Sequence, residues 1–108
     1  MRLLKPFPLA ALVLLLYAPA ASAATYVVTK YADSNDGVCD ADCSLREAIA
    51  AANATAANDT IGFDTNIFNV ARTIVLASGE IVIANNGTLT ITGPGAASDG
   101  LLTLSGNN

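Results

Sequence analysis

The chain of 108 residues contains no histidine and no tryptophan, and it has five lysine or arginine residues against nine aspartate or glutamate residues. Without histidine, this chain cannot build a histidine metal site or histidine-based catalysis. The shortage of basic residues makes nucleic acid and anionic membrane surfaces poor partners. Thr, Asn, Gly and Ser interrupt the apolar runs that follow the amino-terminal segment. We therefore expect no membrane span, which needs about 20 apolar residues.

The first residues have the three zones of a cleavable export signal. Arg2 and Lys5 give a positive start, residues 9–16 form an unbroken apolar run, and small residues follow at positions 18–23. The apolar run is too short for a spanning helix. The sequence therefore predicts export to the extracellular space, the cell surface or the outer membrane.

Cleavage of this signal is expected after Ala23, because the three residues ending there fit the A-x-A pattern, with Ala24 as the second choice. Residues 1–23 are then the signal peptide, and residues 24–108 form one small exported unit. That unit keeps three basic and all nine acidic residues, so its net charge is −6.

Two cysteines, Cys39 and Cys43, lie close together in this exported unit. An oxidising location favours a disulfide over a reduced metal site. A bridge across so short a loop contributes about 2 kcal/mol on the loop-entropy estimate. Its expected role is to fix the turn that enters the next element. A redox pair is the alternative, but the spacing is C-x-x-x-C rather than C-x-x-C.

The segment from Ser44 to Glu47 has the S-x-x-E pattern of a capping box, which predicts the start of a helix of about nine residues ending near Asn53. Arg46 is expected to neutralise Glu47, Asp42 or the turn. Apolar residues then recur at one helical face: Leu45, Ala48, Ile49 and Ala52. So short a helix is stable only when this face docks on another element.

Short apolar segments separated by turn residues predict strands along the rest of the chain. They are residues 25–31, 61–63, 73–76, 80–83, 88–92 and 101–104. Such strands suit a sandwich, an α+β domain or a β-solenoid. Apolar triplets begin at positions 61, 81 and 102. This nearly constant spacing is close to the length of one solenoid coil and favours the solenoid, with the helix covering its apolar end.

The residues Cys43-Ser44-Leu45-Arg46-Glu47-Ala48 spell the motif that names the CSLREA-domain proteins, and the chain resembles that family over nearly all of residues 24–108. Matching segments also occur at residues 28–30, 36–40, 49–53, 89–96 and 102–108. Such modules stand at the amino terminus of exported bacterial proteins, many similar to polymorphic outer-membrane proteins or adhesins, that continue as pectin-lyase-like, right-handed parallel β-helices. The resemblance carries over no catalytic residue.

The resemblance implies a mainly β fold: the start of a right-handed parallel β-helix with a short amphipathic capping helix at its amino-terminal end. The chain offers about two coils, whereas solenoids need about three or more and a cap at each end. We therefore expect it to be a fragment or the amino-terminal piece of a longer protein.

Five oxygen-bearing side chains, Asp33, Asn35, Asp36, Asp40 and Asp42, form the densest polar cluster of the sequence. Closely spaced oxygen ligands are what calcium requires, which makes this cluster a candidate calcium site. The spacing is one residue short of the EF-hand register, and no closing Glu follows. The alternative is a solvated turn whose side chains bond their own backbone.

Asp40 and Asp42 could also form a catalytic carboxylate pair. Their place before a predicted helix favours a role in complementing the helix dipole. The leading hypothesis is a non-enzymatic capping module, with binding of a surface ligand or polysaccharide in coils beyond it. The alternatives are the amino-terminal part of a polysaccharide-acting β-helix enzyme and a calcium-stabilised extracellular domain.

Overall fold

The computed structural model describes residues 22–84, 87–96 and 99–107. The predicted signal peptide therefore lies outside the described residues, apart from Ser22 and Ala23. Within the described ranges, no helix has the length and apolar character needed to cross a membrane.

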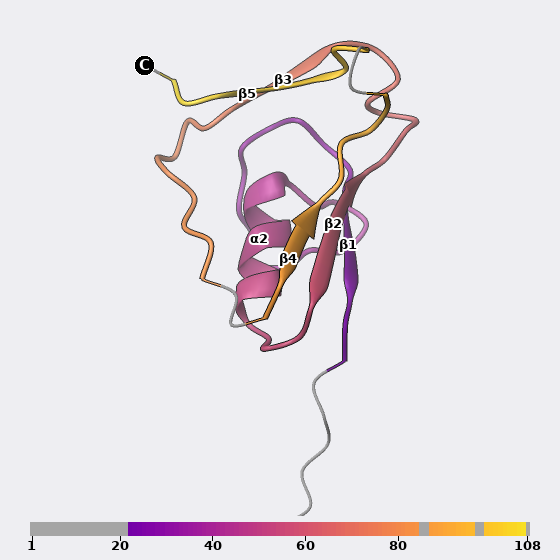
Figure 1. The fold of residues 1–108 in the computed structure, drawn as a ribbon. Coiled ribbons are helices and arrows are strands. Elements are labelled where there is room, and N and C mark those ends of the chain that lie inside the picture. The colour runs from indigo at the N-terminus through magenta and orange to yellow at the C-terminus, as the bar shows by residue number, and fades with distance from the viewer. Residues whose placement is uncertain (1–21, 85–86, 97–98, 108) are drawn as a thin grey trace, which may run out of the picture.

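The described chain consists mainly of short strands with one short helix (Figure 1). The elements are β1 (Thr25–Val28), α2 (Leu45–Asn53), β2 (Asp59–Phe63), β3 (Arg72–Val75), β4 (Leu89–Ile91) and β5 (Leu102–Ser105). Five of the six predicted strand segments thus overlap a strand of the structure. The prediction for residues 80–83 was wrong, because this segment forms no strand.

The strands form two small, open parallel sheets, one in the order β1-β2-β4 and the other containing β3 and β5. In the first sheet Asp59 is paired with Leu89, and in the second Arg72 is paired with Leu102. The two pairings therefore join positions with the same offset along the chain. The shorter spacing expected from the sequence was wrong, because β5 pairs with β3 and not with residues 81–83.

The helix begins and ends where the sequence predicts. The Ser44 side chain accepts a hydrogen bond from the Glu47 amide, and the Glu47 carboxylate accepts one from the Ser44 amide, which confirms the capping box. The face predicted to be apolar is buried: Leu45, Ala48, Ile49 and Ala52. It contacts β1 and β2, beside which it lies in Figure 1.

The core lies between α2 and the two sheets. In β2 the inward residues Asp59, Ile61 and Phe63 alternate with half-buried ones, as expected for a strand with one covered face. The Phe63 ring meets the Phe68 ring edge-on, with 5.2 Å between their centroids. Ile74 from β3 closes the cluster, so both sheets contribute to one core.

Candidate functional site

Glu47 organises the long connection between β1 and α2. Its side chain is fully buried, one carboxylate oxygen accepts from the Ser44 amide at 2.7 Å, and the other accepts from the Asp36 amide at 2.7 Å. The Lys30 amine lies 3.8 Å from the same carboxylate. A single side chain thus ties the helix start to a loop residue 11 positions earlier.

The Glu47 carboxyl has a strongly lowered pKa. Burial alone would raise the pKa, but the amides of Asp36 and Ser44 that donate to the carboxylate outweigh burial and lower the pKa from 4.5 to about 2. Glu47 is therefore ionised at neutral pH, and its charge is used to hold backbone amides.

Arg46 forms a bidentate ion pair with Asp33, with Nε to Oδ1 at 2.7 Å and Nη2 to Oδ2 at 2.9 Å. The hydrogen bond from Arg46 holds the pKa of the Asp33 carboxyl below its ordinary value, helped by the amide of Ser78, which donates to Oδ2 at 2.9 Å. Of the three partners expected for Arg46, the turn is the one observed: its guanidinium binds Asp33 in the turn that follows β1, and not Glu47 or Asp42.

The segment of residues 79–84 is bound to α2 by side chains of the helix. Arg46 donates to the carbonyls of Gly79 at 2.6 Å and Glu80 at 3.1 Å. At the other end of the helix, the Asn53 amide donates to the Val82 carbonyl, and its oxygen accepts from Ala84 N, both at 2.9 Å. Asn53 thereby supplies the donor and acceptor that a neighbouring strand would supply.

The geometry of these contacts fits a helix that stands in for a strand. Arg46 and Asn53 are seven positions apart, so they lie on one helical face about 10 Å from each other along the axis. The residues that they bind follow in the same order along the helix, with Gly79 and Glu80 at Arg46 and Val82 and Ala84 at Asn53. This role of Arg46 and Asn53 was not predicted from the sequence. The i, i+7 spacing of two polar residues was the available signal.

The disulfide prediction is confirmed, since Cys39 and Cys43 are bonded. Cys43 is fully buried, and its backbone is tied to the residue that follows β1: Thr29 N donates to the Cys43 carbonyl and Cys43 N donates to Thr29 Oγ1, both at 2.8 Å. The bridge therefore fixes the turn that precedes the helix, which is the predicted local role.

The predicted calcium ligands bond to the protein itself. Asn35, Asp36 and Asp40 each accept from the amide two residues ahead at 3.0 Å, as in Asx turns. Asp42 pairs with Lys30 at 2.9 Å, and Asp33 pairs with Arg46. Within the described ranges, no three or more His, Cys, Asp or Glu residues are grouped so that they could hold a metal. Calcium binding and catalysis by Asp40 and Asp42 stay predictions.

An apolar hollow of about 240 Å³ lies between α2 and the last strands. It is lined by Leu45, Ile49, Phe63, Leu76, Ile81, Ile83, Ile91, Gly93, Leu102 and Leu104. None of these side chains can donate, accept or transfer a proton, so the chemistry that this hollow offers is apolar contact.

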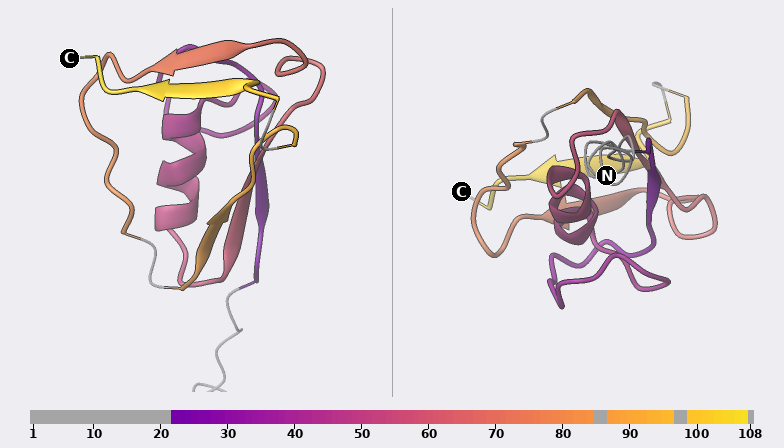
Figure 2. Two further views of the ribbon diagram at one scale, coloured as in Figure 1. Left: turned by 45° about the horizontal axis from the view of Figure 1, so that its top comes forward. Right: turned by 90° about the horizontal axis from the view of Figure 1, so that it is seen from below.

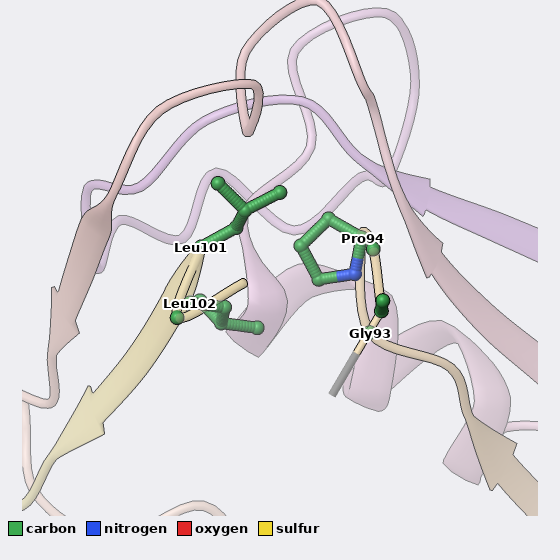
Figure 3. A pocket seen from close by; sticks show the side chains of 7 residues that line it. Gly93, Pro94, Leu101 and Leu102 are labelled. Carbon is green, nitrogen blue, oxygen red and sulfur yellow. The ribbon is translucent and has the colours of Figure 1, made fainter. Parts of the chain in front are cut away.

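A second hollow, of about 200 Å³, lies in the turn that joins β4 to β5. Figure 3 shows the Gly93-Pro94 turn on one side of it, and Leu101 and Leu102 on the other. The other lining residues are Gly95, Ala96 and Gly100. Because no lining side chain is polar, the only polar groups that the lining residues offer are those of their backbone.

The described chain is thus mainly β, and its buried side chains Ser44 and Glu47 form hydrogen bonds with backbone groups of the same chain. Comparison with protein-family models, with curated proteins and with solved structures found no match to this chain.

Proposed function

We propose that the chain is the helix-capped amino-terminal end of a right-handed parallel β-helix in an exported protein. In this proposal it is a non-enzymatic module that starts and covers the β-helix, and binding of a surface ligand or polysaccharide belongs to coils beyond it. The observation that carries the proposal is the common offset of two parallel pairings, from Asp59 to Leu89 between β2 and β4 and from Arg72 to Leu102 between β3 and β5. The pairing of β1 with β2 has a longer offset, because the connection between these strands contains α2.

A common offset is what a solenoid requires. Each wall of a solenoid stacks a strand on the strand one coil earlier, so every wall repeats at the same interval along the chain. Here β2, β3 and residues 79–84 would be the three walls of one coil, and β4 and β5 the first two walls of the next. Right-handed winding is the expected hand, because parallel strands joined by crossovers almost always have it.

The contacts of α2 support the capping role. The helix covers the core with one face and binds residues 79–84 through Arg46 and Asn53, in the place where a strand of an earlier coil would lie. The polar connection behind the helix is fastened by Glu47. Because these side chains all bind the chain's own backbone, they support a scaffolding role.

Appending one more coil tests the proposal. A second copy of residues 79–108, placed after Asn108, would carry its strands at the offset that already separates β2 from β4 and β3 from β5. We expect the longer chain to unfold at a higher denaturant midpoint, with slower amide exchange in β4 and β5, because both strands gain a neighbour.

The matched control lacks the first residue of the appended copy. This deletion shifts the copied strands by one residue and turns their apolar side chains outward. The proposal fails if the full copy does not raise the midpoint, or if the shortened copy raises it equally.

A further inference from the structure

A carboxylate is buried at the start of β2, beside the residue that would become the amino terminus after signal removal. Asp59 is 1% exposed, and it is the first of the three inward residues of this strand. Strand β1 pairs with β2 in parallel, with Thr25 opposite Thr60, and Thr60 N donates to the Ala24 carbonyl at 2.9 Å. Ala24 therefore lies level with Asp59. The left-hand view of Figure 2 shows the starts of β1 and β2 together, next to the connection from α2.

The backbone nitrogen of Ala24 donates to this carboxylate. It lies 2.9 Å from Asp59 Oδ1, and Thr55 Oγ1 donates to Asp59 Oδ2 at 2.6 Å. Ala24 is half-buried, whereas Ser22 and Ala23 are exposed and belong to no helix or strand. The nitrogen that binds the buried carboxylate is thus the one that forms the peptide bond at which the A-x-A pattern predicts cleavage.

We propose that cleavage after Ala23 converts this hydrogen bond into an ion pair, in which the α-ammonium of Ala24 binds the buried carboxylate of Asp59. Hydrolysis adds one water across the Ala23–Ala24 peptide bond and leaves a carboxylate on Ala23 and an ammonium on Ala24. The nitrogen keeps its N–H to Oδ1 and gains a positive charge and two further N–H groups. A buried carboxylate is costly without an opposite charge next to it, and charge-assisted hydrogen bonds are stronger than neutral ones.

Signal removal thereby becomes a step that completes the fold. The precursor has a neutral amide at Ala24, so it lacks a stabilising charge that the processed chain possesses. Cleavage after Ala24 would remove the donating nitrogen together with its residue, so the contact with Asp59 favours cleavage after Ala23. The inference rests on the export signal of the proposed function, but it does not depend on whether an appended coil stacks on β4 and β5.

The intact mass of the exported protein shows where the signal is removed. The chain of 108 residues is produced with its own signal in a bacterial host, and the exported form is collected. We expect its amino terminus to be Ala24. A terminus at Thr25, or a chain that keeps its signal, overturns the proposal, because neither form places an ammonium against Asp59.

Three forms of the exported unit measure the ion pair. Residues 24–108 carry the ammonium at Ala24, the Nα-acetylated form has a neutral amide there, and residues 22–108 keep the amide with the charge two residues away. We expect the unfolding equilibrium constant of the first form, from urea denaturation, to be about tenfold lower than those of the other two, which should agree within about twofold. Equal constants for the three forms overturn the proposal.

Two variants distinguish Asp59 from other carboxylates. In Asp59→Asn the effect of acetylation should fall below about twofold, whereas in the matched control Glu80→Gln, at an exposed position, it should remain about tenfold. If Asp59→Asn does not fold, the carboxyl ¹³C resonance of Asp59 in the parent replaces it: acetylation should shift this resonance and leave that of Asp99 unchanged. An acetylation effect that persists in Asp59→Asn, or an Asp59 resonance that does not move, overturns the proposal.

Discussion

Residues 22–75 and the later strands β4 and β5 contain similar alternating sequences, but only residues 22–75 have a buried core. Every described residue that is buried lies between Val28 and Ile74. Ile61 and Ile91 are register partners in the same sheet, yet Ile61 is fully buried and Ile91 is 45% exposed. The same residue type in the same sheet thus differs in exposure because its neighbours differ.

The second sheet repeats this contrast. Ile74 is 1% exposed, whereas its register partner Leu104 is 55% exposed. Ile74 belongs to the core cluster that includes residues of α2 and of the first sheet, while Leu104 borders the 240 Å³ hollow. An alternating sequence specifies which side chains turn inward, and burial additionally requires an element that covers them.

Ile61→Ala and Ile91→Ala give the most direct test of this contrast. Ile61→Ala should lower the free energy of unfolding by about 4 kcal/mol because it opens a cavity in the core, and Ile91→Ala should lower it by less than about 1 kcal/mol. Urea denaturation at concentrations where sedimentation shows a monomer measures both. If Ile61→Ala does not fold, Ile61→Val should still cost about 1 kcal/mol. Equal losses at the two positions would remove the distinction.

Glu47→Ala should have the next largest effect. It leaves the buried amide of Ser44 and the part-buried amide of Asp36 without their acceptor, for an expected loss of about 3 kcal/mol in unfolding free energy. Glu47→Gln keeps one acceptor oxygen and should lose less. A loss below about 1 kcal/mol for Glu47→Ala would show that the connection is held by other contacts.

The pH dependence of stability provides the second measurement on Glu47. Its folded pKa of about 2 is lower than its ordinary value of 4.5, so its contribution is complete above pH 4.5 and is lost as the pH falls toward 2. The lowered pKa of Asp33 acts in the same direction. The stability of Glu47→Gln should fall less between these pH values, and an unchanged profile would contradict the assignment.

Removing the disulfide should cost somewhat less than removing Glu47. The double variant Cys39→Ser with Cys43→Ser is expected to lose about 2 kcal/mol of unfolding free energy, because the reduced loop gains entropy in the unfolded chain. The substitution should accelerate amide exchange mainly in β1 and β2, which belong to the region with the core. A larger acceleration in β4 and β5 than in β1 and β2 would contradict that expectation.

Ser44→Ala should cost about 1–2 kcal/mol of unfolding free energy, because the alanine variant lacks a hydroxyl that makes two hydrogen bonds. The Ser44 hydroxyl accepts from the Glu47 amide at 3.1 Å and donates to the Ser34 carbonyl at 2.6 Å. Ser44→Thr is the matched control, because threonine keeps the hydroxyl. Indistinguishable unfolding midpoints for the alanine variant and the parent would argue against the cap.

The sequence was most informative where structure is local. The S-x-x-E pattern predicts the start of α2, Asn53 predicts its end, and the close cysteines in a chain with an export signal predict their bridge. Both depend on residues within a few positions of one another, so the chain pattern alone determines them.

Pairing between distant segments was harder to predict. Residues 81–83 have a strand-like sequence that suggests stacking with residues 102–104, but α2 takes the place of their strand partner. Nothing in the β-branched pattern of residues 81–83 distinguishes a helix side chain from a strand as a hydrogen-bond partner. The contacts of Arg46 with the Gly79 and Glu80 carbonyls were missed for the same reason, since they join positions far apart in the chain.

Asn53→Ala should have the smallest effect on the free energy of unfolding. It acts at the contact between α2 and residues 79–84. Asn53 joins α2 to the backbone of Val82 and Ala84 by two hydrogen bonds that are both exposed to solvent. Exposed bonds contribute little to global stability, so we expect a loss of less than about 1 kcal/mol. Local opening should nevertheless become easier, since Ala84 N loses the oxygen to which it donates.

Amide exchange followed by NMR separates these two readouts. Asn53→Ala should speed exchange at Ala84 while leaving the amides of Ile61 and Phe63 unchanged, because those two residues belong to the core. Asn53→Asp is the matched control: it keeps the oxygen that accepts from Ala84 N but cannot donate to the Val82 carbonyl, so exchange at Ala84 should fall between the parent and the alanine variant. Equal acceleration across β2 would mean that the helix and residues 79–84 open together with the core, and that the region with the core and the later strands form one cooperative unit.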